Sequence, residues 1–192
     1  MKSNSKTPAK TVEKKEVTLP AKKITDSRTI MTEMIMPNDT NPMGNLMGGN
    51  LLRWMDIAAA VCAGKHCASH VVTASVDHVS FTKAIHNGDV ITIEAVVTRS
   101  FNTSVEIFVE VSAANVKGGD LRRCNHAYFT FVGLEDGTFQ PQPVPQVIPL
   151  TGEEEKQFEE ALKRRELRLI LSGRMKPQDS ISLKNLLSLP NG

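Results

Sequence analysis

The stretch 41–56 reads N-P-M-G-N-L-M-G-G-N-L-L-R-W-M-D and joins a polar, glycine-rich loop to an apolar segment. From residue 55 to 64 the sequence MDIAAAVCAG contains a single charge, Asp56. This apolar run is too long for a strand, and a helix that is apolar on all sides is normally buried. We therefore expect a buried helix that ends near Cys67, with Asn50 as its N-cap.

Two features of this stretch suggest chemistry. A lone carboxylate in an apolar helix is costly unless it is hydrogen-bonded, paired or used in a reaction. The pair Gly48-Gly49 allows the backbone to approach a ligand, and the N–H groups at a helix start have no partner within the helix. Amides beside a carboxylate suit attack on a carbonyl carbon. The alternative is a structural carboxylate bonded to a backbone or asparagine group, beside an ordinary glycine turn.

Extended segments surround this helix in the sequence. One strand is expected before it at 29–36, and four follow it at 71–81, 90–101, 105–111 and 122–134, separated by turn signals rich in Asn, Gly and Asp. Each of the four alternates apolar with polar residues, as half-buried strands do. A long helix beside one antiparallel sheet predicts an α+β fold. The faces expected to be apolar carry Val72, Ala74 and Val76; Ile91, Ile93, Ala95 and Val97; Val105, Ile107, Val109 and Val111; and Ala127, Phe129 and Phe131.

The flanks divide the chain into three parts. Residues 1–25 are rich in lysine and are expected to form a disordered, solvated leader. The main domain covers residues 26–149, whose last part, 139–149, is too rich in proline and glutamine to enter a sheet interior. Residues 150–192 are expected to form a helix and a tail. That helix opens with the capping box Thr151–Glu154, and the order of the chain from about Gly173 is left open.

Composition excludes several classes of protein. The chain has 192 residues, 40% of them hydrophobic, and a net charge of +2, which argues against a dedicated nucleic-acid binder. We find no apolar run long enough to span a membrane and no signal peptide. The three cysteines and the five histidines show no metal-ligand spacing, so we expect no metal. We expect reduced thiols and a cytoplasmic location.

Four motifs in register resemble the hotdog fold, and within it the acyl-CoA hydrolase (thioesterase) family. They are the segment 41–60 and, in the same order, V-V-T-A-S-V-D-H-V-S-F at 71–81, I-H-N-G-D-V at 85–90 and N-T-S-V-E-I at 102–107. The resemblance covers about residues 28–145. It implies an antiparallel sheet wrapped around a long buried helix, with the C-terminal helix added. It also implies hydrolysis of acyl-CoA to free CoA and a carboxylic acid in fatty acid metabolism. No cofactor is implied beyond the CoA of the substrate.

The resemblance also implies roles for particular residues. Asp56 matches the catalytic carboxylate of the helix, as general base or nucleophile, and Asn41 matches an asparagine that completes the site from a facing subunit. The turn Gly48-Gly49 matches the segment whose amide polarises the thioester carbonyl. Five further residues lie where the family lines the path of pantetheine and nucleotide: Thr73, Ser80, Phe81, Thr103 and Ser104.

The same resemblance implies a homo-oligomer in which two hotdogs pair, and we expect a trimer of such dimers, a hexamer. Two alternatives to a thioesterase stay open. A hotdog dehydratase or hydratase acting on 3-hydroxyacyl thioesters usually pairs a histidine with the helix acid, where this chain offers Asn41. A non-catalytic acyl-CoA sensor usually carries a DNA-binding module. Basic residues could hold CoA phosphates, although each is more often a solvated charge: Arg53, Lys83, Arg99, Arg122, Arg123 and the cluster at 163–168.

Overall fold

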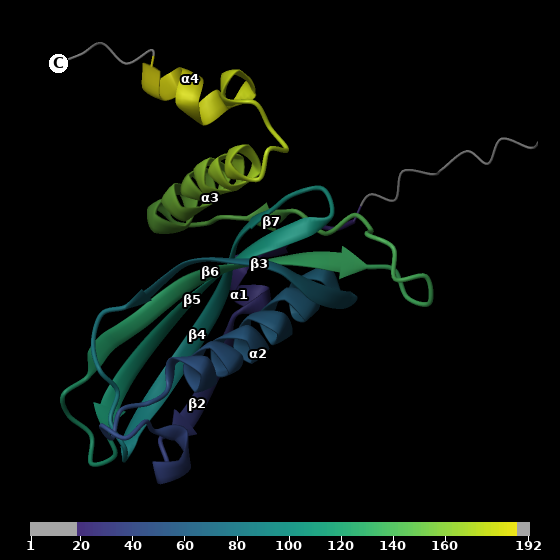
Figure 1. Cartoon of the computed structure of the whole chain (residues 1–192). Coiled ribbons are helices and arrows are strands. Elements are labelled where there is room, and N and C mark those ends of the chain that lie inside the picture. Colours follow the sequence, from purple (N-terminus) through teal and green to yellow (C-terminus); the bar gives the residue numbers. More distant parts are fainter. Residues whose placement is uncertain (1–18, 188–192) are drawn as a thin grey trace, which may run out of the picture.

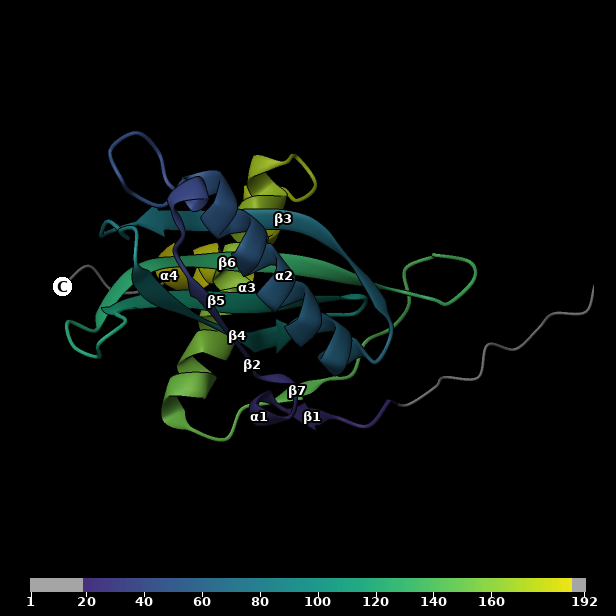
Figure 2. The same ribbon diagram turned by 90° about the horizontal axis from the view of Figure 1, so that it is seen from below.

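A five-stranded antiparallel sheet and one long helix form the body of the computed structural model, which describes residues 19–187, without the side chains of 185–187. The helix α2 (Gly48–Cys67) crosses one face of the sheet, and α3 (Gly152–Leu171) covers part of the other (Figures 1 and 2). The strand order is β2-β4-β5-β6-β3. The strands are β2 (Thr29–Met34), β3 (His70–Phe81), β4 (Asp89–Ser100), β5 (Ser104–Asn115) and β6 (Arg122–Leu134).

The expected inner faces of three strands are confirmed. Alternate residues of β4, β5 and β6 are fully buried under α2, because the period of a strand sends every second side chain to the same face. The other side of these strands is more polar and meets α3. Nearly all of the core therefore lies between α2 and the sheet.

Two predictions around α2 are wrong. The helix begins at Gly48, its N-cap is Met47, and no side chain caps it. Asn50 lies inside the first turn and donates to the carbonyl of Asp39 instead. The helix is also not buried on all sides, because Ile57 is 39% exposed and Val61 is 45% exposed in the single chain. A sequence pattern cannot tell a surface covered by the chain itself from one left for a partner.

The strand β3 departs from its prediction in the same way. It lies at the edge of the sheet, and the predicted apolar face is open: Val72 is 48% exposed and Val76 is 42% exposed. Two irregularities interrupt its pairing with β6, one after Thr73 and one after Asp77. The edge strand β3 and the partly exposed helix α2 pack against each other, so their open surfaces are adjacent.

Short elements close the two ends of the domain. The strand β1 (Lys22–Lys23) pairs in parallel with β7 (Val147–Ile148), outside the main sheet, as the proline-rich composition of that segment requires. Lys22 donates to the carbonyls of Lys65 and His66 at the end of α2. Most of the expected leader lies outside the described residues, but its last part contains β1 and the start of α1 (Ile24–Ser27). The remaining short helices are η1 (Pro37–Asp39), η2 (Pro177–Asp179) and α4 (Ile181–Leu187).

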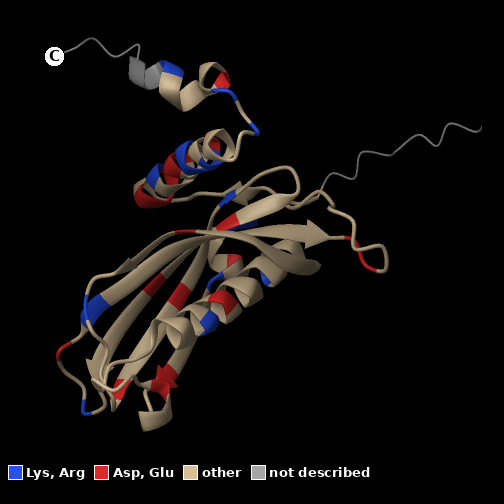
Figure 3. Cartoon of the chain, viewed as in Figure 1, with Lys and Arg blue, Asp and Glu red and all other residues tan. Residues whose placement is uncertain are grey.

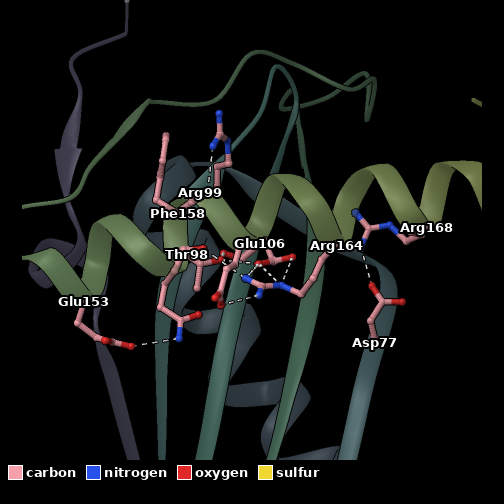
Figure 4. A network of polar contacts seen from close by, with 10 residues as sticks. Asp77, Thr98, Arg99, Glu106, Glu153, Phe158, Arg164 and Arg168 are labelled. Carbon is pink, nitrogen blue, oxygen red and sulfur yellow. Dashed lines mark hydrogen bonds and ion pairs between the residues drawn. The ribbon is translucent and has the colours of Figure 1, made fainter. Parts of the chain in front are cut away.

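The outer helix α3 begins as predicted. Thr151 accepts from the N–H of Glu154, and the Glu154 carboxylate accepts from the N–H of Thr151. Figure 3 shows that α3 carries charges of both signs along its length. These charges bind the helix to the sheet, as Figure 4 shows. Arg164 pairs with Glu106 of β5 at 2.8 Å, and Arg168 pairs with Asp77 of β3 at 2.6 Å.

Candidate active site

Asp56 lies on the third turn of α2 and is half-buried rather than enclosed. Its carboxylate oxygen Oδ1 accepts a hydrogen bond of 2.8 Å from the hydroxyl of Thr73 on β3. This bond fixes one oxygen of the carboxylate and leaves the other without a hydrogen bond among the described residues. The arrangement gives a held, solvent-accessible carboxylate, which can act as a base or a nucleophile.

The sequence predicts only that Thr73 lines the CoA path and gives no sign of its hydrogen bond to Asp56. A threonine in a strand carries no signal of such a contact. The contact depends on how β3 lies against α2, and the irregularity in β3 directly after Thr73 is set by pairing with β6.

The start of α2 offers free backbone N–H groups. No side chain caps the helix, so its first N–H groups have no capping hydrogen-bond partner and stay available to a ligand. Phe81 of β3 lies against this start: a Cβ added at Gly48 would be 3.3 Å from the ring atom Cζ of Phe81. Glycine therefore permits the close approach of the ring, and the ring shields this part of the helix start. Amides at such a place can stabilise a developing oxyanion.

Asn41 is held in its own loop. Its side-chain oxygen accepts from the N–H groups of Met43, at 2.9 Å, and Asn45, at 3.2 Å. This is the local turn role that asparagine commonly has. The hydrogen bonds of the described residues do not link Asn41 to Asp56. Its amide NH2 makes no hydrogen bond in the described part of the chain and is free to donate.

The other expected binding residues are spread over the fold. Ser80 lies next to Phe81 on β3, whereas Thr103 and Ser104 lie at the turn between β4 and β5. The Thr103 carbonyl accepts from the N–H of Gly133. Within residues 19–187, no hydrogen bond joins Thr103 or Ser104 to Asp56 or Gly48. A single chain thus brings together Asp56 with Thr73, and Gly48 with Phe81.

The cysteines lie in the interior. Burial raises the pKa of Cys62 to about 12 and that of Cys67 to about 11, and it also raises the pKa of Cys124. Thiolates are the nucleophilic form of cysteine, and burial in apolar surroundings disfavours them. These thiols are therefore packing groups, and the carboxylate of Asp56 is the stronger candidate for chemistry.

Comparison with known proteins agrees with this fold. The thioesterase superfamily model matches residues 43–118. The uncharacterized acyl-CoA thioester hydrolase YkhA of Bacillus subtilis (strain 168) is 37% identical over 67% of this chain and 74% of its own length. An apo-hexameric acyl-CoA thioesterase superposes with a TM-score of 0.77 at 37% identity, over 80% of this chain and 98% of the other.

A second solved relative was determined with coenzyme A bound. The acyl-CoA hydrolase of Staphylococcus aureus, in complex with butyryl coenzyme A, coenzyme A and coenzyme A disulfide, has a TM-score of 0.74 at 31% identity, over 88% of this chain and all of the other. It has also been solved as three alanine variants, of an asparagine, an aspartate and a threonine. The chain therefore belongs to the hotdog-fold acyl-CoA thioester hydrolases of the thioesterase superfamily.

Proposed function

We propose that this protein hydrolyses the thioester of acyl-CoA to free CoA and a carboxylic acid, with Asp56 as the general base or nucleophile. The observation that carries the proposal is the Asp56 carboxylate held by Thr73 on the outer side of α2. The asparagine, aspartate and threonine altered in the Staphylococcus aureus hydrolase follow one another at the same spacing as Asn41, Asp56 and Thr73, which supports the proposal. Positioned acid–base groups typically contribute factors of about 100 to 10,000 to a rate.

We assign the stabilisation of the oxyanion in this reaction to the backbone N–H groups at the start of α2. The absence of a capping side chain there supports a role for the amides of Gly48 and Gly49. Asp56 lies seven positions beyond Gly49, about 10 Å along the helix axis, so one chain cannot easily supply both groups to one carbonyl. We therefore place Asp56 of one chain opposite the helix start and Asn41 of a second chain.

The assembly follows from the same surfaces. We infer that two sheets continue each other at β3, because this edge and the adjacent face of α2 are apolar and open in the single chain. Hexameric thioesterases among the solved relatives support a trimer of these dimers. We place the enzyme in the cytoplasm. Three buried cysteines without disulfides support this, as does the lack of a helix long and apolar enough to cross a membrane within residues 19–187.

Release of CoA thiol from acyl-CoA of increasing chain length tests the proposal. We expect the wild type to release thiol, and we expect both Asp56→Ala and Asp56→Asn to lower kcat by about 100-fold or more, because neither side chain can act as a base. Circular dichroism and sedimentation control for folding and assembly. Thiol release by both variants at more than about a tenth of the wild-type rate would refute the role of Asp56. Wild-type protein that binds acyl-CoA without releasing thiol would refute hydrolysis and favour a sensor.

A further inference from the structure

Asn125 is a polar side chain at the end of an apolar row. On β6 the residues Ala127, Phe129 and Phe131 face α2, and Asn125 continues the same alternation. Its partner on β5, Val111, is fully buried on that face as well. Asn125 is 3% exposed, and in the part of the chain that the structure describes neither its Oδ1 nor its Nδ2 has a hydrogen-bond partner. An unpaired carboxamide inside a core destabilises the fold, and natural cores contain few of them.

This carboxamide lies close to the start of α2. In the pairing of β3 with β6, Phe81 stands directly opposite Asn125, so the two side chains are on the same face of the sheet. Residues paired in this way have Cβ atoms about 4.5–5.5 Å apart. The ring of Phe81 also lies against Gly48, where an added Cβ would be 3.3 Å from the ring atom Cζ. Asn125 and the helix start are therefore neighbours of the same aromatic ring.

A small cavity opens at this ring. Its volume is about 250 Å3, and its apolar wall is formed by Leu46, Leu51, Phe81 and Ile85 together with Cys124, the residue before Asn125. Ligand pockets usually have volumes of about 300–1,000 Å3, so this cavity suits a chain of only a few carbon atoms. The buried Asn125 is not part of the wall itself. It is next to two residues of the wall, Cys124 in the chain and Phe81 across the sheet.

We propose that Asn125 selects short acyl groups that carry a hydroxyl near the thioester, as in a 3-hydroxyacyl-CoA. This inference rests on the proposed hydrolysis of acyl-CoA, with the thioester oxygen at the amides of α2. Exposed side chains change rotamer within nanoseconds, and Phe81 is 58% exposed. When its ring turns away, it uncovers both the helix start and the Asn125 carboxamide.

A hydroxyl matches this carboxamide in both of its roles. The Asn125 Oδ1 can accept a hydrogen bond from the hydroxyl, and the Nδ2 can donate one to the hydroxyl oxygen. A plain chain of the same length leaves both groups unpaired. The cost of leaving buried polar groups unpaired is what allows such a site to reject an analogue that lacks one hydroxyl.

Release of CoA from 3-hydroxybutyryl-CoA and from butyryl-CoA tests this selection, because the two acyl chains have equal length and differ by one hydroxyl. We expect the wild-type kcat/KM to be about tenfold or more higher for 3-hydroxybutyryl-CoA. Asn125→Leu keeps the approximate volume and removes both hydrogen-bonding groups, so the ratio should fall to about one. The Tm of Asn125→Leu should not fall, because an apolar side chain replaces an unpaired polar one. If it does fall, Asn125→Ser is the deciding variant and should give an intermediate ratio.

The matched control is Thr130→Val. The hydroxyl of Thr130 is also buried without a partner among the described residues, but it lies on the other face of β6, opposite Glu106. Thr130→Val therefore removes an unpaired polar atom from the same strand, away from the cavity. Its ratio of kcat/KM values should equal that of the wild type.

Binding separates this inference from the proposed function. Calorimetric titration of Asp56→Ala with the two acyl-CoAs, with and without Asn125→Leu, measures the preference without turnover. A preference for 3-hydroxybutyryl-CoA that Asn125→Leu abolishes supports the selection even where the wild type releases no CoA, and then hydrolysis alone fails. Equal kcat/KM values and equal affinities for the two acyl-CoAs overturn the selection while hydrolysis stands. A preference that persists in folded Asn125→Leu and Asn125→Ser also overturns it.

Discussion

At the scale of single residues, the contact between Thr73 and Asp56 is the most specific feature of the site. The hydroxyl of Thr73 is the only group that donates to the Asp56 carboxylate within residues 19–187, at 2.8 Å. A single charge-assisted bond of this kind holds one oxygen in place while the other stays free to take a proton or to attack. We therefore propose that Thr73 positions the carboxylate of Asp56.

Replacement of Thr73 by valine keeps the shape of the side chain and removes the hydroxyl. We expect kcat to fall about tenfold or more, with a smaller change in KM, because a hydrogen bond to a charged group contributes about 1.5–3 kcal/mol. Steady-state kinetics with one acyl-CoA check this. Thr73→Ser restores the hydroxyl and should recover most of the rate. A valine variant with wild-type kcat, or a serine variant as slow as valine, would contradict the positioning role.

At the scale of elements, the sequence was a good guide wherever a pattern is local. The alternation in β4 to β6 and the capping box of α3 are read directly from neighbouring residues. The first turn of α2 could not be predicted in this way. Asn50 donates to the carbonyl of Asp39, which lies 11 positions earlier in another turn. The sequence gives no local sign of the open faces of α2 and β3 either. Their apolar residues follow the same pattern as core residues, although they are exposed in the single chain.

The attachment of α3 to the sheet depends on a buried carboxylate. Glu106 is 0% exposed and is bonded by Thr98 and Arg164. We expect Arg164→Ala to lower the free energy of unfolding by about 3–5 kcal/mol, because it leaves Glu106 buried without its counterion. Arg28→Ala, which breaks an exposed pair with Glu94, is the control and should cost about 1 kcal/mol or less. Chemical denaturation measures both, and equal losses would contradict the assignment.

The end of α2 is joined to the segment before β7 by a titratable group. His66 is fully buried, and its Nε2 lies 3.0 Å from the carbonyl of Pro145. Burial lowers the pKa of His66, an effect opposed by the Pro145 bond and by Asp26 and assisted by Lys22. The folded protein therefore favours the neutral form of His66. It should lose stability as the pH falls below about 6.5, the pKa of histidine in the unfolded chain. Tm measured from pH 8 to pH 5 should fall less steeply in His66→Gln. An equal slope would contradict this.

At the scale of the whole molecule, the proposed mechanism requires more than a single chain. Asp56 and the Gly48 helix start lie too far apart along one helix to share a carbonyl, and the Asn41 loop is closed on itself by its own hydrogen bonds. The unpaired edge of β3 offers backbone groups to a second sheet. We therefore propose that the dimer both covers the apolar surface and completes the site.

Mixing two inactive variants tests the shared site. Asn41→Ala and Asp56→Ala should each be inactive as pure oligomers. After subunit exchange, mixed dimers hold one site with both residues and one with neither, so thiol release should partly return. Exchange is verified by a mass tag on one variant, and unmixed samples treated in the same way are the control. Verified exchange without recovery would mean that both residues act within one chain.

The buried cysteines have a consequence for an enzyme whose product is itself a thiol. Each turnover of an acyl-CoA hydrolase releases coenzyme A, which on oxidation becomes a disulfide able to exchange with protein thiolates. Cys62 and Cys67 have pKa values raised to about 12 and about 11, and both side chains lie inside the core. Exchange requires the thiolate and access to it, and these cysteines offer neither. Coenzyme A disulfide can thus form around the folded protein without becoming covalently linked to Cys62 or Cys67.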